Sequence, residues 1–272
     1  MEYTHLRSFL FVPATQPERI VKALDSNADI VIVDLEDAVA PDEKSKGRQA
    51  LSHFLDNYPS AQIIVRVNPV TSREFREDIS LCGSYAGIVG VMLPKVETVH
   101  QIEQATAIKK PVWPLIETAR GLIALSTLVF TQGIERLTFG SVDLATDLNL
   151  KPGSAGADKL LDQCRYELVL CSRSAGLPPP VESVVPEIND LSKVENTAIQ
   201  ASEMGFSGML CIHPKQLSII HSAFSPSEHE LAWAHQVIEG ASRCAGAFQL
   251  HGKMIDAPVI ERAKMLLRRA KQ

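Results

Sequence analysis

The chain of 272 residues is 45% hydrophobic and 22% charged, with a net charge of −5. This composition is typical of a globular protein with a large core, and the acidic balance without a long basic run argues against nucleic-acid binding. No apolar stretch is as long as a membrane span and no leader pattern is present, so we expect a cytoplasmic protein without membrane contact. The five cysteines are far apart in the sequence, which predicts reduced thiols instead of disulfides or a zinc site.

Short runs rich in Val, Ile and Leu alternate with helix-like stretches along the chain. Runs of this composition are typical of strands that are buried on both faces. The predicted strands are 8–12, 30–35, 62–67, 87–93, 112–116, 136–139, 181–185 and 208–212. The predicted helices are 17–26, a helix ending at 55, 96–107, 119–127, a helix from the 149–156 loop to 175, 193–204, a short helix from 214, and 227–244.

The strands recur roughly every 20 to 30 residues, with one larger gap before the seventh, which predicts an α/β fold, the TIM (β/α)8 barrel, over residues 1–245. No GxGxxG or P-loop pattern opens a helix, as a nucleotide-binding sheet would require. Residues 246–272 follow the eighth strand and are expected to form a hairpin-like segment and a final helix, 258–270. This C-terminal extension could pack under the barrel, cap its own site or reach a neighbouring subunit's site.

Two carboxylates, Glu117 and Asp143, close consecutive predicted strands. A barrel of parallel strands brings such ends to one rim, where the chemistry of this fold lies. Carboxylates on adjacent strand ends can share Mg²⁺, which prefers oxygen ligands and usually keeps several waters. The alternative is that each carboxylate stabilises the start of the helix that follows it.

Three more carboxylates, Asp34, Glu36 and Asp37, crowd the end of the second predicted strand. Their mutual repulsion is unfavourable unless a cation or several hydrogen-bond donors compensate it. Glu36 and Asp37 fit a supporting role in which they accept hydrogen bonds from metal-bound waters. The alternative is a solvated acidic loop beside Lys44 and Lys46.

The basic candidates are Arg66, Arg7, Lys95 and His213. The guanidinium of Arg66 ends the third strand and can bind a carboxylate in two bonds, stabilise an enolate oxygen, or form a structural ion pair. Arg7 precedes the first strand, which places it at the opposite rim or just inside the barrel. Lys95 is expected to stay charged beside the carboxylates instead of forming a Schiff base, and His213 is expected to be structural.

Nine short blocks follow one another along nearly the whole chain. They are RSFLFVP from Arg7, PER from Pro17, DLEDAV from Asp34, RVN from Arg66, LPK from Leu93, LIET from Leu115, GSVDL from Gly140, IHP from Ile212 and GKMID from Gly252. In this order the blocks resemble the citrate lyase β-subunit-like branch of the HpcH/HpaI aldolase superfamily. The resemblance implies a TIM barrel that assembles as a homotrimer, or as a hexamer of two trimers.

The same resemblance implies a Mg²⁺ site on Glu117 and Asp143, with Glu36 and Asp37 as catalytic residues that support its bound waters. Arg66 would be catalytic and hold the oxygen of an oxoacid or enolate.

The resemblance also assigns Arg7 and Glu117, together with Arg66, to substrate binding. The aspartate of the GKMID block in the family's CoA lyases crosses to the next subunit as an acid/base, and Asp256 matches it.

The implied activity is Mg²⁺-dependent cleavage of a 3-hydroxyacyl-CoA thioester, such as citramalyl-CoA or malyl-CoA, to acetyl-CoA and a 2-oxoacid such as pyruvate or glyoxylate. The alternatives are a citrate lyase β subunit that acts on a citryl thioester held by an acyl carrier protein, a metal-dependent aldolase of free oxoacids, and a non-catalytic barrel that binds ligands. The sequence departs from the family pattern at Ala14, Thr15, Glu182 and His251, which leaves the acyl group open.

Overall fold

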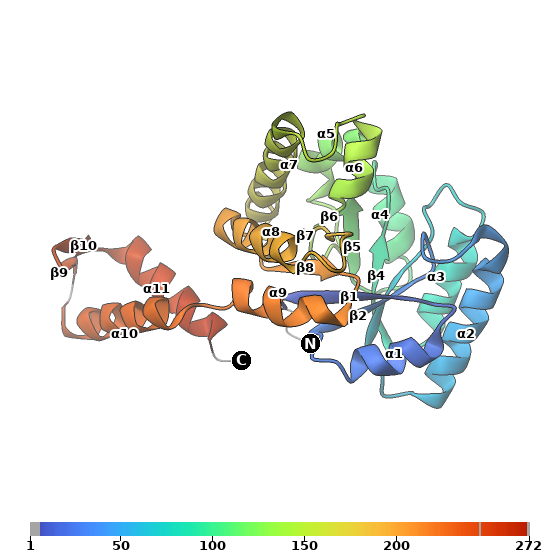
Figure 1. Cartoon of the computed structure of the whole chain (residues 1–272), viewed down its shortest axis with the longest axis horizontal. Coiled ribbons are helices and arrows are strands. Elements are labelled where there is room, and N and C mark those ends of the chain that lie inside the picture. Colours follow the sequence, from blue (N-terminus) through green and yellow to red (C-terminus); the bar gives the residue numbers. More distant parts are fainter. Residues whose placement is uncertain (1–5, 245, 271–272) are drawn as a thin grey trace.

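The computed structural model describes residues 6–244 and 246–270. Eight parallel strands close a barrel in chain order, and helices surround it (Figure 1), which confirms the predicted TIM barrel. The strands are β1 (Ser8–Pro13), β2 (Ile30–Asp34), β3 (Ile63–Arg66), β4 (Ile88–Leu93), β5 (Val112–Ile116), β6 (Thr138–Phe139), β7 (Val181–Glu182) and β8 (Gly208–Cys211). The predicted strands therefore lie in the right places, although β6 and β7 are only two residues long.

The helices that cover the barrel include two that the sequence pattern did not predict. They are α1 (Pro17–Leu24), α2 (Lys44–Asn57), α3 (Phe75–Ser84), α4 (Val99–Thr106), α5 (Ala119–Leu128), α6 (Ser141–Asp147), α7 (Ala155–Ser174), α8 (Leu191–Met204) and α9 (Leu217–Phe224). Short 3-10 turns, Pro41–Glu43 and Pro214–Gln216, precede α2 and α9. The unpredicted helices are α3 and α6, and in neither does the N-cap residue, Glu74 or Gly140, cap the helix with its side chain. None of the described helices has the length and apolar character that crossing a bilayer requires.

Two apolar layers hold the barrel together, one inside the strands and one between strands and helices. The inner layer contains Phe9 and Trp113, both fully buried, with ring centroids 5.4 Å apart. Strand side chains alternate between the two layers, so β1–β5 and β8 each contribute to both. The large inner side chains fill the barrel interior, and open space remains at the carboxyl ends of the strands.

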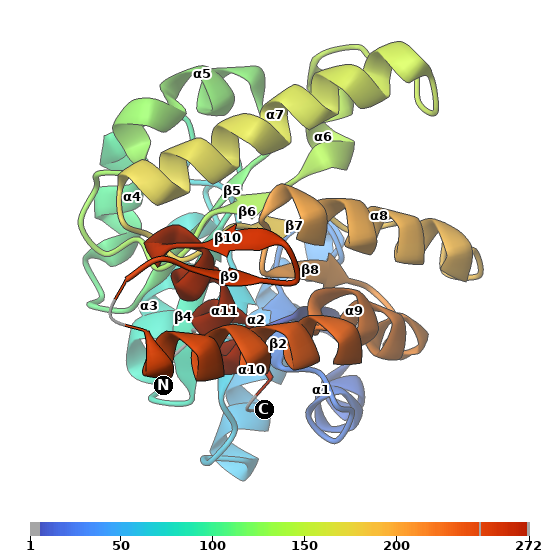
Figure 2. The ribbon, with the colours of Figure 1, turned by 90° about the vertical axis from the view of Figure 1, so that its left-hand side faces the viewer.

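The last part of the chain forms an arm that projects from the barrel (Figure 1). It consists of α10 (Glu228–Arg243), a hairpin of β9 (Phe248–Leu250) and β10 (Lys253–Ile255), and α11 (Ala257–Arg269). Figure 2 looks along the arm towards the barrel and shows the hairpin beside α10 and α11. The predicted hairpin and final helix are therefore present, but α10 belongs to the arm, which begins near residue 227 and not at 246.

The arm has an apolar core of its own, in which Ala234, Val237, Ile255, Ala263 and Leu266 are buried. A Cβ atom at position 240 would lie 2.4 Å from a ring carbon of Phe248, so glycine there lets the hairpin pack closely on α10. The sequence placed α10 with the barrel because an amphipathic helix shows that one face is covered but not what covers it.

We predict that Ile255→Ala unfolds the arm selectively, because the substitution leaves a cavity that costs about 2–5 kcal/mol in a core this small. Hydrogen exchange should increase in peptides from α10 and α11 while peptides from the barrel strands stay protected. The neighbouring Met254→Ala is the control, since Met254 is 70% exposed and its loss should leave exchange unchanged. Equal deprotection of barrel and arm in the Ile255 variant would contradict an independent arm core.

Candidate functional site

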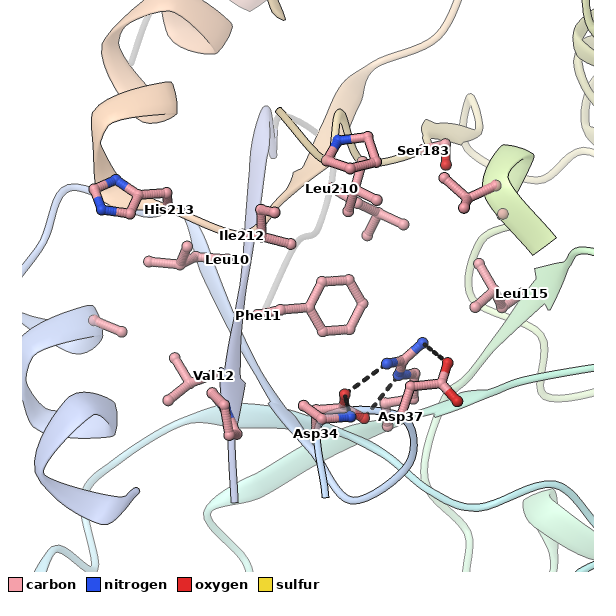
Figure 3. Close-up of a pocket in the computed structure, with 18 of the residues that line it drawn as sticks. Leu10, Phe11, Val12, Asp34, Asp37, Leu115, Ser183, Leu210, Ile212 and His213 are labelled. Atoms are coloured by element: carbon pink, nitrogen blue, oxygen red, sulfur yellow. Dashed lines mark hydrogen bonds and ion pairs between the residues drawn. The ribbon is translucent and has the colours of Figure 1, made fainter. Parts of the chain in front are cut away.

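A cavity of about 860 Å³ opens at the carboxyl ends of the barrel strands (Figure 3). Its charged and polar lining side chains are Arg19, Lys22, Asp34, Asp37, Arg66, Glu117, Asp143, Ser183 and His213. Its apolar lining includes Leu10, Phe11, Val12, Leu115, Phe139, Val142, Leu210 and Ile212. The cavity therefore joins one charged wall, built around β2, β3 and β5, to a largely apolar one.

Arg66 is fixed in the cavity wall by a bidentate salt bridge to Asp34. Its Nε donates to Asp34 Oδ1 at 2.7 Å and its Nη2 to Asp34 Oδ2 at 2.5 Å. Its Nη1 lies 3.2 Å from Glu36 Oε2 and 3.5 Å from Asp37 Oδ2, and its Cζ is 4.8 Å from the centre of the Phe11 ring. Burial opposes the charge of Arg66, but the three carboxylates outweigh burial and raise its pKa. Arg66 is thus a permanent, rigidly oriented cation.

Glu36 is buried, so the acidic loop after β2 is not simply a solvated cluster. Its Oε1 accepts a 2.6 Å hydrogen bond from Lys95 Nζ, and its Oε2 faces Arg66. Burial raises the pKa of Glu36 although both cations act against it. Lys44 does not neutralise the acids directly, because its Nζ donates to the carbonyls of Leu35 and Glu36 and thereby holds the loop.

Lys95 connects the two acidic groups of the site through its backbone and its side chain. Its backbone is left-handed, with φ of 51°, and its N–H donates to Glu117 Oε1 at 2.9 Å. Burial works against the lysine charge, but the bond to Glu36 and the surrounding carboxylates raise the pKa of Lys95. A lysine held in its charged form is a poor Schiff-base nucleophile, in agreement with the expectation from sequence.

Glu117 lies at the end of β5, and burial raises its pKa to about 8, with further increases from the charges of Glu36 and Asp143. A Cβ atom at position 140 would lie 2.7 Å from Glu117 Oε2, so this carboxylate rests directly on the backbone of Gly140. The N–H of Gly140 donates to the carbonyl of Ile116 at 2.9 Å. These contacts place the first turn of α6, which carries the half-buried Asp143, beside Glu117.

The chemistry of this pair fits a hard divalent cation. Two carboxylates border the same cavity, and the raised pKa of Glu117 shows that its negative charge lacks enough compensation there. Within residues 6–244 and 246–270, no group of three or more His, Cys, Asp or Glu side chains is arranged to hold a metal. The protein would therefore supply two oxygen ligands, which is typical of Mg²⁺, since this ion takes its remaining ligands from water or substrate.

Three of the predicted site residues are not among the residues that line this cavity. Glu36 is in contact with the lining through its ion pair with Arg66, whereas Arg7 and Asp256 lie away from the cavity of their own subunit. Arg7 is at the opposite rim, where its N–H donates to Asp29 Oδ2 at 2.7 Å and its Nη1 to Ser225 Oγ at 3.1 Å. These bonds give Arg7 a structural role within the subunit, because the amino end of a barrel strand faces away from the carboxyl rim. Asp256 is on the arm, where its side chain accepts from the N–H of Val259 and caps α11.

The structure adds residues that the sequence reasoning did not select. Arg19 and Lys22 line the cavity from α1, and both are exposed. Their spacing of three residues on a helix that follows the first strand was the available signal. Glu182, in contrast, points away from the cavity and accepts a 2.7 Å bond from Arg165 Nε of α7. Ser183, the next residue, lines the cavity.

Fold and site together define a (β/α)8 barrel with an acidic cavity at its carboxyl rim. The chain belongs to the HpcH/HpaI aldolase/citrate lyase family, whose model matches residues 7–214. This match contains all eight barrel strands and ends before the arm.

Relatives of known description cover almost the whole chain. A citrate lyase subunit beta-like protein of Mycobacterium tuberculosis is 32% identical over 96% of this chain and 94% of its own length. A (3S)-malyl-CoA thioesterase of Cereibacter sphaeroides is 31% identical over 97% of this chain and 94% of its own length. The crystal structure of CitE from Mycobacterium tuberculosis in complex with magnesium, acetoacetate and coenzyme A superimposes with a TM-score of 0.88 and 32% identity, covering 98% of this chain and 99% of that one.

We predict that the affinity for Mg²⁺ rises with pH until the pKa of Glu117, about 8, is passed. Below this pKa a proton competes with the cation for the carboxylate, so the affinity should rise about tenfold for each pH unit and then level off. Titration calorimetry with MgCl2 between about pH 6 and pH 9 measures this dependence. Glu117→Gln is the control and should bind weakly at every pH; a wild-type affinity that does not change with pH would contradict the assignment.

Proposed function

We propose that the protein is a Mg²⁺-dependent carbon–carbon lyase that cleaves a 3-hydroxyacyl-CoA thioester to acetyl-CoA and a 2-oxoacid. The observation that carries the proposal is the placement of Glu117 and Asp143 in one cavity with the fixed guanidinium of Arg66. The neighbouring CitE structure with magnesium, acetoacetate and coenzyme A supports the same combination of ligands.

Glu117 and Asp143 would hold Mg²⁺, which supplies Lewis-acid polarisation of the oxygens on the oxoacid half of the substrate. Arg66 would stabilise the negative charge that develops as the carbon–carbon bond breaks. Asp34 and the ring of Phe11 already hold its guanidinium, so little reorganisation accompanies the reaction. Glu36 and Asp37 would accept hydrogen bonds from waters in the site.

The charges of the cavity favour an oxoacid with a single carboxylate. Among the described lining residues, Arg66 is the one arginine or lysine that lies at the end of a barrel strand and is half-buried, and Arg19 and Lys22 are exposed on α1. The apolar part of the lining includes Leu115, Phe139 and Leu210. A methyl group or a hydrogen on the carbinol carbon suits such a wall, whereas a second carboxylate would be desolvated without a partner. We therefore propose citramalyl-CoA or malyl-CoA as substrate, with pyruvate or glyoxylate as product.

Arg19 and Lys22 support coenzyme A as the acyl carrier. Both cations lie on the cavity lining near its exposed edge, where the phosphates of a CoA thioester would remain close to solvent. A thioester on an acyl carrier protein would bring one phosphodiester to the same place. Competition between the CoA-bound and the carrier-bound substrate therefore shows which of the two the protein prefers.

The experiment that tests the proposal uses purified protein, Mg²⁺ and a panel of malyl-, citramalyl- and citryl-CoA. We expect the release of glyoxylate or pyruvate, its loss with EDTA, and a fall of at least about a hundredfold in kcat for Glu117→Gln. Glu187→Gln is the matched control, because Glu187 is an exposed acid paired with Lys193 outside the cavity lining. Release of CoA and free malate without glyoxylate would instead identify a thioester hydrolase, the activity named for the relative from Cereibacter sphaeroides.

We further propose that the arm of one subunit delivers Asp256 to the cavity of its neighbour in a homotrimer or a hexamer. The arm has its own core and projects from its own barrel (Figure 1), and Asp256 sits at the start of α11. In this position its carboxylate would exchange the proton at the enolate carbon or the hydroxyl.

Mixed oligomers test this arrangement. Glu117→Gln and Asp256→Asn should each be inactive alone, because each destroys one half of every site. Reassembly of an equal mixture should recover about a quarter of the wild-type activity, since a site then combines Glu117 from one chain with Asp256 from the next. An active Asp256→Asn protein, or a mixture that stays inactive although the subunits exchange, would contradict the shared site.

A further inference from the structure

The helix that carries Asp143 cannot supply its own cap. The N-cap position of α6 is Gly140, which makes no side-chain hydrogen bond to the first turn. Serine, threonine, asparagine and aspartate are the residues that normally perform this function. None of them fits at this position, because a Cβ atom on residue 140 would lie 2.5 Å from Glu117 Cβ and 2.7 Å from its carboxylate. The close approach of Glu117 therefore leaves the first N–H groups of α6 without an acceptor from their own segment.

A serine from the next strand supplies the missing acceptor. Ser183 Oγ accepts a 2.9 Å hydrogen bond from the N–H of Ser141, the first residue of α6. Ser183 is 2% exposed and directly follows β7, and Figure 3 shows it among the side chains that line the cavity. The hydroxyl therefore joins the end of β7 to the start of α6 at the edge of the site.

Ser183 is itself held in place from the outer layer of the barrel. Its N–H donates to Glu182 Oε1 at 2.8 Å. Glu182 is fully buried and accepts 2.7 Å and 3.3 Å bonds from the Arg165 guanidinium, whose Cζ lies 5.6 Å from the centre of the Phe139 ring. A chain of contacts thus runs from Arg165 through Glu182 and Ser183 to the first turn of α6.

We propose that Ser183 is a positioning residue that caps α6 in place of Gly140 and so holds Asp143 where it can share a cation with Glu117. The inference rests on the proposed function, because it takes Asp143 to be a ligand. Asp143 is the third residue of α6, so fraying of the uncapped first turn would move its carboxylate away from Glu117. Ser183 does not need to touch the cation or the substrate for this effect.

Two measurements on the full-length protein test the proposal. Hydrogen exchange of the peptide that spans α6, in the absence of metal, reports on the cap alone. Binding of Mn²⁺, measured by the loss of the free-ion electron paramagnetic resonance signal, reports on the carboxylate pair. Ser183→Ala should increase exchange in α6 and weaken Mn²⁺ binding about tenfold, whereas Ser183→Thr, which keeps the oxygen, should restore both towards wild type.

Ser154→Ala is the matched control, because Ser154 caps α7 by accepting from the N–H of Ala157. This variant should increase exchange at the start of α7 and leave Mn²⁺ binding unchanged. An unchanged Mn²⁺ affinity in Ser183→Ala, with binding abolished by Glu117→Gln, would overturn the positioning role and leave the lyase proposal intact. Wild-type protein that binds no Mn²⁺, or binding that persists in Glu117→Gln, would overturn the metal site and this inference with it.

Discussion

Buried negative charge governs the architecture of the cavity. Glu36 and Glu117 both lie almost out of contact with water, where an ionised carboxylate is unfavourable. Glu36 has two cationic partners, Arg66 and Lys95, whereas within residues 6–244 and 246–270 Glu117 accepts a backbone N–H and has no ion pair. The negative charge of Glu36 is therefore better compensated than that of Glu117, and Glu117 also faces the charge of Asp143. This imbalance is the feature on which the proposed cation site depends.

The backbone around the site shows what this arrangement requires. Lys95 has a left-handed backbone, and its N–H donates to Glu117. Residue 140 is a glycine, and the absence of a Cβ atom there leaves room for the same carboxylate against the backbone. Strained backbone conformations persist at functional sites when the surrounding structure holds them in place. Here the surrounding structure is the barrel, whose inner layer of large side chains, including Phe9 and Trp113, fixes the strand ends from below.

The sequence predicted the barrel well because its strands are apolar runs buried on both faces, and their polar ends fall on one rim in any parallel barrel. The same rule brought Arg66, Glu117 and Asp143 together. It failed for α3 and α6, whose N-cap residues Glu74 and Gly140 supply no capping side chain, and for the start of the arm. Patterns along the chain report which face is covered, but they do not report which element covers it.

Other features depend on distances that a sequence does not contain. Glu182 is one of the departures from the family pattern, and the sequence does not show that its side chain turns outward to Arg165 of α7. Arg7 opens the first family block but binds Asp29 at the other end of the barrel. Arg7 comes just before the first residue of β1, and the amino end of a strand lies at the rim opposite its carboxyl end.

The contact between Arg7 and Ser225 has a consequence for the arm. Ser225 is the first residue after α9, at the point where the chain leaves the barrel for α10. Arg7 is also tied to Asp29, just before β2, so this exit is anchored to the two strands that begin the fold. The arm therefore leaves the barrel from a point that Arg7 holds at the amino ends of the strands, on the side of the barrel away from the cavity.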